Sequence, residues 1–336
     1  MAASHLVGSV PLDDAEQVFR TVAGVLAGQV KRLPDGETGE RSNWIGFQIG
    51  RLLAADGIEE SAPEDSPGYG PLPKVRLTRP ASEIALGSLG YAEAARSSYQ
   101  TFTRLRDEGT IPSDVRFQVS LPTPLAVVNS WVAREDQDAF EPVYERKLLA
   151  ELDEILAAIP HDELAVQWDV AVEVGILENA FPATRAQDFD GIVEQLVRLA
   201  GRVPADVALG FHLCYGDYQH RHFKQPESLA VPVELANAIS ARAERRIDWF
   251  HMPVPPDRTD AAYFAPLADL RLPPETELYL GVVHPDGVEA TQRRLDAARA
   301  ALGDGRPLGV ATECGLGRTP REQLDVLLRT HADVRA

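Results

Sequence analysis

The sequence predicts an α/β protein, and more specifically a (β/α)8 TIM barrel, from three observations. Short apolar runs rich in β-branched and aromatic residues recur eight times and alternate with stretches of helical periodicity. No Gly-x-Gly-x-x-Gly segment follows the first run, although a dinucleotide-binding doubly wound sheet would need one there. Residues able to do chemistry gather directly after these runs, where the loops of a barrel build its active face.

The predicted strands and helices are spread evenly over the chain. Strands are expected at residues 4–10, 30–36, 116–121, 164–170, 207–213, 246–252, 277–283 and 307–312. Helices are expected near residues 12–28, 41–54, 139–158, 188–202, 228–242, 286–302 and 320–330. Some of these helices begin with acidic residues, which suit the positive end of a helix. We therefore expect one barrel domain that covers residues 1–336.

The segment after the second predicted strand is much longer than an ordinary barrel connection. It contains a loop rich in proline and glycine at residues 61–74 and a further predicted helix near residues 82–108. Connections of this length are uncommon in compact domains and usually serve a function. We therefore expect an insertion at residues 57–110 that acts as a lid over the active face.

The composition is that of an acidic globular protein. Hydrophobic residues make up 44%, and no stretch reaches the roughly 18–20 consecutive apolar residues of a membrane span. The chain has 33 basic and 51 acidic residues, and its formal net charge of -18 repels a nucleic acid backbone. The first thirty residues lack the basic start and apolar run of a secretory signal. We expect a cytoplasmic protein that binds neither membranes nor nucleic acids.

Both cysteines lie at predicted strand ends. His212 and Cys214 form a His-x-Cys pair after the fifth strand, and residues two apart on a strand point to the same side. Cys314 follows the eighth strand and could reach the same point across the barrel mouth. Imidazole and thiolate suit Zn²⁺, and three protein ligands leave open the position that catalytic zinc sites keep. The alternative is a buried, metal-free cysteine beside a core histidine.

Other strand ends supply a hydroxyl group, two carboxylates and two more histidines. These residues are Ser9, Glu37, Asp169, His251 and His284. Glu37 and Asp169 could hold a substrate ammonium group by charge-assisted hydrogen bonds. A metal at the cysteines would also turn a thiol into a nucleophilic thiolate at neutral pH, which suits alkyl transfer to sulfur. For each polar residue taken alone, a helix cap or a solvated surface side chain is the alternative.

The strand-end segments together resemble the catalytic C-terminal barrel of cobalamin-independent methionine synthase. That family lies within a wider group of methionine-synthase-like and uroporphyrinogen-decarboxylase-like barrels. The matching segments are VGSVP at 7–11, DGETGERSNW at 35–44, SLPTPLAVVNSW at 120–131, VQWDVAVEVG at 166–175, FHLCYGD at 211–217, LYLGVV at 278–283 and ECGLGRT at 313–319. They span nearly the whole chain in family order, and the His-x-Cys and Cys-Gly-Leu segments are the most specific.

The resemblance implies roles for most of these residues. The implied zinc ligands are His212, Cys214 and Cys314. Ser9 would lie near a substrate carboxylate, and Glu37 and Asp169 near the substrate amino group. In that family a methyl group passes from a folate to zinc-bound homocysteine.

The sequence also departs from the family pattern. The family's glutamate ligand is replaced by His251, which could itself bind the metal or leave three ligands. Of the family's Asp-Glu-Pro after the fourth strand only Asp169 remains, and His284 aligns with the proton-carrying histidine only after a gap. Full-length members carry an additional N-terminal barrel, and we expect none in this protein. A net charge of -18 with four lysines would not attract a polyanionic folate tail.

The leading hypothesis is a zinc-dependent methyl- or alkyltransferase. It would present a homocysteine-like thiol as a zinc-bound thiolate to a methyl donor such as a methylated folate. One alternative is a metal-free lyase or decarboxylase of the uroporphyrinogen-decarboxylase type, although that chemistry has no use for two thiolate ligands. Another alternative is a non-catalytic zinc-binding barrel in which His251 closes a site of four ligands.

Overall fold

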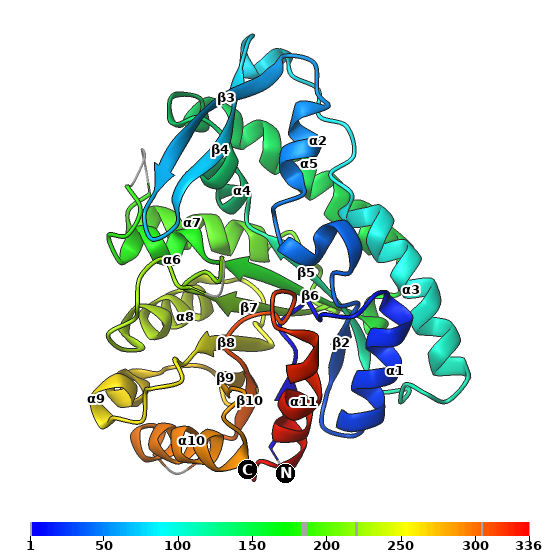
Figure 1. Cartoon of the computed structure of the whole chain (residues 1–336), viewed down its shortest axis with the longest axis vertical. Helices are drawn as coiled ribbons and strands as arrows, with labels where there is room; N and C mark the ends of the chain where they lie inside the picture. Colours follow the sequence, from blue (N-terminus) through cyan, green and yellow to red (C-terminus); the bar gives the residue numbers. More distant parts are fainter. Residues whose placement is uncertain (1, 183–186, 219–220, 304, 336) are drawn as a thin grey trace.

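Eight parallel strands form one sheet that curves into a nearly closed barrel, which confirms the predicted fold class (Figure 1). The computed structural model describes residues 2–182, 187–218, 221–303 and 305–335. The strands follow one another in the order β1-β10-β9-β8-β7-β6-β5-β2. Their bounds are Ser4–His5 for β1, Arg32–Pro34 for β2, Arg116–Pro122 for β5, Leu164–Val170 for β6, Ala208–Leu213 for β7, Trp249–Pro253 for β8, Glu277–Val283 for β9 and Leu308–Thr312 for β10.

Next to β1 and β2 the barrel closes through two isolated bridges, Ser4 with Val30 and Ser9 with Gly36, rather than through a continuous ladder. The strand expected at residues 4–10 is regular only at Ser4–His5. Beyond it, side-chain amides take the place of strand hydrogen bonds: Gln118 Nε2 donates to the Leu6 and Val7 carbonyls at 3.1 and 3.0 Å. Gln167 Nε2 also donates to Val7 O, at 2.7 Å. These buried amides fix the irregular backbone that leads into the active face.

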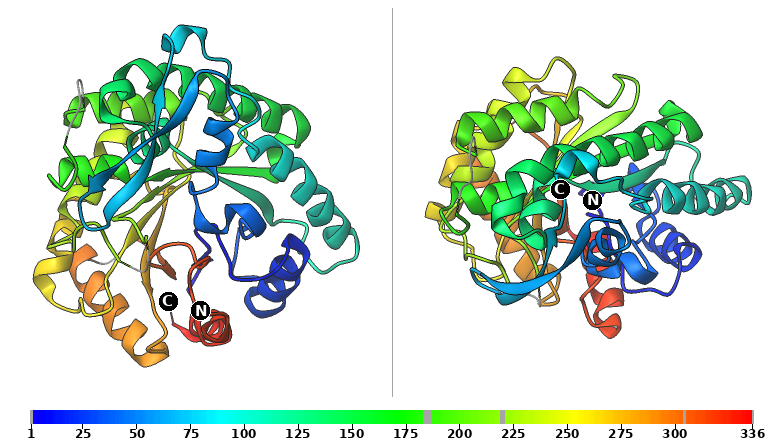
Figure 2. Two further views of the ribbon diagram at one scale, coloured as in Figure 1. Left: turned by 45° about the horizontal axis from the view of Figure 1, so that its top comes forward. Right: turned by 90° about the horizontal axis from the view of Figure 1, so that it is seen from above.

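Helices surround the sheet on its outer side, and the two ends of the chain lie together (Figure 2). The longer helices are α1 Ala15–Leu26, α3 Tyr91–Asp107, α5 Gln137–Ala158, α7 Phe189–Ala200, α8 Ala230–Arg242, α10 Val288–Leu302 and α11 Leu324–Asp333. The short ones are α2 Gln48–Leu53, α4 Pro124–Trp131, α6 Val172–Leu177 and α9 Ala261–Phe264. Among the helices of the described ranges, none has both the length and the apolar character needed to cross a bilayer.

Acidic caps begin two of the predicted helices. Asp14 accepts a hydrogen bond from Gln17 N–H at 2.8 Å, and Asp188 accepts one from Gly191 N–H at 2.9 Å. The helix expected near residues 41–54 is instead a 3-10 turn at Gly39–Asn43 followed by α2. The break falls at Trp44, whose φ of 48° is incompatible with a continuous right-handed helix.

The prediction of a loop at residues 61–74 is wrong. These residues belong to a β-hairpin formed by β3 Ile58–Ser66 and β4 Gly70–Leu77. A two-stranded ribbon has two free edges, so prolines that lack an N–H group are tolerated there. Gly68 and Gly70 supply the positive φ angles of the turn, 78° and 79°.

The hairpin stands at the same end of the molecule as α2 (Figure 1). The helix within the predicted insertion, α3, packs instead in the outer layer. There Phe102 of α3 meets Phe19 of α1 with ring centroids 5.5 Å apart. Within residues 57–110, the hairpin is therefore the part that leaves the barrel layers.

Candidate functional site

Three metal-ligating side chains meet at the carboxyl end of the barrel. His212 is on β7, Cys214 follows directly after it, and Cys314 follows β10. The two sulfur atoms lie 3.7 Å apart, and Cys314 Sγ lies 3.6 Å from His212 Nε2. The three ligand atoms all lie within 4.8 Å of one another, and no other group of three such residues is found in the described part of the chain.

Two of the three separations match a tetrahedral zinc ion. With ordinary bonds of about 2.3 Å to sulfur and about 2.0–2.1 Å to nitrogen, tetrahedral angles place two sulfurs about 3.8 Å apart and sulfur and nitrogen about 3.6 Å apart. The observed separations of 3.7 and 3.6 Å are close to both values. The donor set of one imidazole and two thiols is also one that zinc prefers.

His251 does not join this cluster but lies behind His212. The Nδ1 atoms of the two rings are 2.6 Å apart, and His251 Nε2 lies 3.0 Å from the Thr312 carbonyl. A carbonyl only accepts, so His251 carries its proton on Nε2 and accepts from His212 at Nδ1. His212 Nε2 is thereby left with a free lone pair toward the cysteines.

Both rings are neutral in this arrangement. Burial lowers the pKa of His251 to about 3. Burial and the neighbouring His251 lower the pKa of His212 well below its ordinary value. A neutral imidazole is the form that binds a metal.

The Cys314 thiol resists ionisation in these surroundings. The adjacent Cys214 thiol and burial raise the pKa of Cys314. The Gly216 N–H donates a hydrogen bond to Cys214 Sγ at 3.2 Å. A divalent cation between the two sulfurs would offset this effect on Cys314, because a coordinating thiol is deprotonated.

The part-buried Glu37 and the buried Asp169 form a carboxylate pair in the same region. Burial and the nearby Asp169 raise the pKa of Glu37 to about 8, and burial raises the pKa of Asp169 to about 7. Asp169 accepts hydrogen bonds from Gln167 Nε2 at 2.9 Å and from Trp44 Nε1 at 3.2 Å. The pair is therefore held in place and resists carrying two negative charges without a cation.

The backbone around Glu37 is unusual. Its φ of 47° is a left-handed conformation that non-glycine residues rarely adopt. A Cβ atom at Gly8 would lie 3.1 Å from Glu37 Oε1, so the glycine allows the carboxylate to approach the chain closely. Next to it, Ser9 Oγ accepts a hydrogen bond from Gly317 N–H at 3.0 Å.

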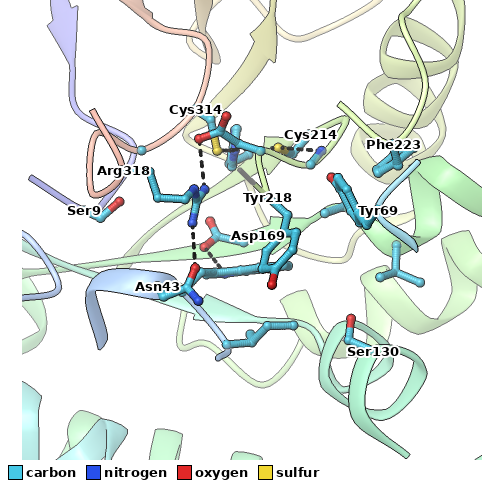
Figure 3. A pocket seen from close by; sticks show the side chains of 18 of the residues that line it. Ser9, Asn43, Tyr69, Ser130, Asp169, Cys214, Tyr218, Phe223, Cys314 and Arg318 are labelled. Atoms are coloured by element: carbon cyan, nitrogen blue, oxygen red, sulfur yellow. Dashed lines mark hydrogen bonds and ion pairs between the residues drawn. The ribbon is translucent and has the colours of Figure 1, made fainter. Parts of the chain in front are cut away.

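One cavity of about 950 Å³, open solvent at its mouth included, joins these groups (Figure 3). Six of the residues predicted from sequence line it, namely Ser9, Glu37, Asp169, His212, Cys214 and Cys314. The structure also adds lining residues that the sequence did not single out as site residues, namely Trp44, Tyr69, Trp131, Phe181, Tyr218, Phe223 and Arg318. The cavity thus has a polar end and an aromatic wall.

Arg318 was missed in the sequence, although it stands four residues after Cys314 in the ECGLGRT segment. Its guanidinium donates to Asp217 Oδ2 at 2.9 Å and to Asn43 Oδ1 at 3.3 Å. The nearby Cys314 and Asp217 raise its pKa. Among the described residues that line the cavity, it is the one permanent cation.

His284 lies outside this cavity. It lines a neighbouring one, together with Glu313, His222 and the other side of Cys314. Its Nε2 donates to the Val254 carbonyl at 2.8 Å, and burial lowers its pKa to about 4.

Comparisons with known proteins support the fold. The chain is similar to a B12-independent methionine synthase from Shewanella sp. W3-18-1, solved in complex with selenomethionine, with a TM-score of 0.68 and 13% identity over 99% of this chain and 97% of that chain. It is also similar to a methyltransferase from Methanosarcina mazei, with a TM-score of 0.50 and 12% identity over 98% of this chain and 94% of that chain. No protein-family model matches the chain, and a search of curated proteins finds no match. At such low identity, the two solved structures establish a shared fold.

Proposed function

We propose that this protein is a zinc-dependent methyl- or alkyltransferase that acts on a homocysteine-like thiol. The observation that carries the proposal is the spacing of the three ligand atoms, which suits zinc and opens on a cavity with a carboxylate pair. The names of two structural neighbours, a methionine synthase and a methyltransferase, are consistent with it. Fold similarity alone does not transfer a substrate, so the site has to carry the argument.

His212, Cys214 and Cys314 would hold the zinc ion. When bound, zinc lowers the pKa of a substrate thiol, so that the thiolate nucleophile is present at neutral pH. His251 acts as a positioning residue. Its Nδ1 accepts the His212 Nδ1 proton, and this fixes the His212 tautomer whose Nε2, on the side of the cysteines, carries no proton. Three protein ligands leave room for the substrate sulfur.

Glu37 and Asp169 would bind the substrate ammonium group. Two neighbouring carboxyls with raised pKa values gain a compensating charge when a cation enters between them. Ser9 would contact the substrate carboxylate at the same end of the cavity. These contacts would orient an α-amino thiol with its sulfur toward the cysteines.

The hairpin of β3 and β4 would cover the cavity. Ser66, Tyr69 and Leu72 of this hairpin line the cavity wall. Excluding water there would protect the reacting thiolate and strengthen its electrostatic interactions. The proton-carrying role of His284 stays a prediction, to be tested by comparing His284→Gln with the native protein.

Metal analysis tests the proposal most simply. Protein purified without added metal is measured by elemental mass spectrometry for the native chain, Cys214→Ser and Cys314→Ser. His331→Gln, a change at a buried histidine of α11, serves as the control for general damage. We expect about one zinc per chain in the native and control proteins and its loss in both cysteine variants. A native protein that cannot be loaded with zinc would overturn the proposal and favour the metal-free lyase.

A further inference from the structure

Four aromatic side chains form the wall of the cavity on the hairpin side. Tyr69 comes from the turn between β3 and β4, Phe181 follows α6, and Tyr218 and Phe223 follow β7. The Tyr69 and Tyr218 rings meet at 65° with centroids 5.3 Å apart, and the Phe181 and Phe223 rings meet at 54° with centroids 4.8 Å apart. We call these four residues the aromatic cage. Figure 3 shows Tyr69 and Phe223 on the side of the cavity opposite Ser9.

The cage touches the backbone that holds a candidate metal ligand. Gly216 has a φ of 73°, and a Cβ atom there would lie 2.2 Å from the Tyr69 hydroxyl oxygen and 2.8 Å from the Phe223 ring. The N–H of the same glycine donates a hydrogen bond to Cys214 Sγ at 3.2 Å. A group held in the cage would therefore lie beside the sulfur cluster.

The charges around the cage suit a cation better than an anion. Arg318 is the one permanent cation among the described lining residues, and it is ion-paired with Asp217. Glu37 and Asp169 add two carboxyls to the same cavity, in a chain of net charge -18. A polyanionic donor, such as a polyglutamylated folate, would meet no unpaired cation on this described surface. Aromatic faces, in contrast, attract methylated cations by their quadrupole.

We propose that the aromatic cage binds the alkyl donor as a methylated onium cation, either a sulfonium or a quaternary ammonium ion. This inference rests on the proposed function and specifies its donor. In the transfer, a lone pair of the substrate thiolate forms a sulfur–carbon bond to the methyl group while the bond between methyl and the onium heteroatom breaks. The electron pair of the broken bond stays on the heteroatom, which leaves as a neutral sulfide or tertiary amine.

This step needs no proton, oxidant or further co-reactant. The anionic thiolate and the cationic donor become two neutral products, so charge disappears as the reaction proceeds. A cavity that is poor in water favours such a step. Compared with water, it destabilises the two charged reactants more than the transition state, in which their charges are partly neutralised. The apolar rings of the cage provide such surroundings next to the cysteines.

A binding experiment tests the cage directly. Calorimetry on the zinc-loaded protein compares choline with its uncharged isostere 3,3-dimethylbutan-1-ol, and also measures tetramethylammonium and trimethylsulfonium ions. We expect choline to bind about tenfold more tightly than the uncharged alcohol, in line with a desolvated cation–π contact. Equal affinity for the two would show that the cage is only a hydrophobic wall and would overturn the inference.

Variants distinguish the contribution of the Tyr69 ring to binding from that of its hydroxyl group. Tyr69→Leu and Phe181→Leu remove an aromatic face and should weaken choline binding at least about fivefold each. Tyr69→Phe keeps the face and should stay within about twofold of the native affinity. Weakening by Tyr69→Phe as large as that by Tyr69→Leu would overturn the inference, because the hydroxyl group would then be the binding element.

An activity assay separates this inference from the proposed function. Methyl transfer to homocysteine is followed by mass spectrometry, with trimethylsulfonium, a trimethylammonium compound or methyltetrahydrofolate as the donor. Transfer from either onium ion, lost in Tyr69→Leu, supports the inference and identifies which onium type reacts. Transfer from methyltetrahydrofolate alone would overturn the inference and leave the proposed function intact. Onium binding without any transfer would overturn the donor assignment.

Discussion

His212 and His251 face each other through their Nδ1 atoms at 2.6 Å, inside the carboxyl end of the barrel. The Thr312 carbonyl on the far side of His251 decides the direction of this hydrogen bond, because it can only accept a proton. One backbone carbonyl thus determines that the Nε2 atom of His212, which lies near Cys314, carries no proton. This chain of contacts links the interior of the barrel to the candidate metal centre.

Replacement of His251 should weaken zinc binding without removing a ligand. His251→Leu leaves the Nδ1 atom of His212 without its partner, so the required tautomer is no longer favoured. Loss of such an outer contact commonly costs roughly 10–100-fold in metal affinity. The zinc dissociation constant, measured by competition with a chelator, checks this expectation.

His331→Leu is the matched control for this measurement. His331 is also buried and bonded to a backbone carbonyl, that of Leu327, but it lies on α11. Its replacement should leave the zinc dissociation constant within about twofold of the native value, since it touches no candidate ligand. Equal losses of zinc affinity in both variants would mean that general destabilisation explains the effect.

The carboxylate pair should control recognition of the substrate amine. Glu37→Gln and Asp169→Asn remove a charge that binds ammonium, so the KM for homocysteine should rise roughly 10–100-fold, as expected for a buried charged hydrogen bond. The KM for the desamino analogue 4-mercaptobutanoate should change little. Steady-state kinetics with both thiols check the difference, and a similar rise for both would refute an amine-binding role.

The same pair predicts a pH dependence. Burial raises the pKa of Glu37 to about 8 and that of Asp169 to about 7, so the pair binds ammonium best when both groups are ionised. The KM for homocysteine should therefore increase as the pH falls from 8 to 6, while that for 4-mercaptobutanoate should not. A flat profile for homocysteine would contradict the assignment.

Glu173 offers a test of stability away from the metal centre. Its carboxyl group is fully buried on α6, and burial raises its pKa to about 7. A carboxyl with a raised pKa favours the folded state while protonated, so this stability is present below the unfolded pKa near 4.5 and is lost as the pH rises through about 7. Glu173→Gln should therefore be more stable than the native protein at pH 8, relative to pH 5, by up to about 3 kcal/mol.

Urea unfolding at the two pH values measures this difference. Glu60→Gln is the control, because it removes the same charge at an exposed position of the hairpin and so measures the effect of the charge change without burial. An equal shift in both variants would show that burial of Glu173 is not the cause.

Gly216 should be sensitive to the smallest possible side chain. Gly216→Ala would place a methyl group 2.2 Å from the Tyr69 hydroxyl oxygen at a φ of 73°. Gly28→Ala is the matched control, because Gly28 has a φ of 75° and nothing within 4 Å of its Cβ position. In both variants the free energy of unfolding should fall by about 1–2 kcal/mol, because alanine disfavours the left-handed backbone. In Gly216→Ala it should fall by roughly 1–3 kcal/mol more, because the new methyl group is crowded. Thermal unfolding of the two proteins gives the comparison.

The strand ends could be read from the sequence because a barrel gathers them at one face. Cys314 lies 100 residues after Cys214 in the chain, yet strand position alone placed it beside His212 and Cys214. The hairpin was not foreseen, because its prolines suggested a loop and two-stranded ribbons tolerate them. The position of His251 behind His212 depends on ring orientation, which strand position does not determine.

The aromatic wall could not be predicted for a similar reason. Tyr69 and Phe181 lie more than a hundred residues apart on a hairpin and a loop, and no periodic pattern links them. Their sequence neighbours are those of an ordinary core or a surface turn. Only the packing of the hairpin over Gly216 brings Tyr69 into the cavity.

Zinc K-edge X-ray absorption on the purified protein, with and without homocysteine, tests the central claim most directly. The proposal predicts two sulfur neighbours at about 2.3 Å and at least one imidazole nitrogen without the thiol, and three sulfur neighbours with it. A spectrum of two sulfurs and two nitrogens that homocysteine leaves unchanged would contradict the proposal. It would instead indicate a closed site of four protein ligands and a non-catalytic zinc-binding barrel.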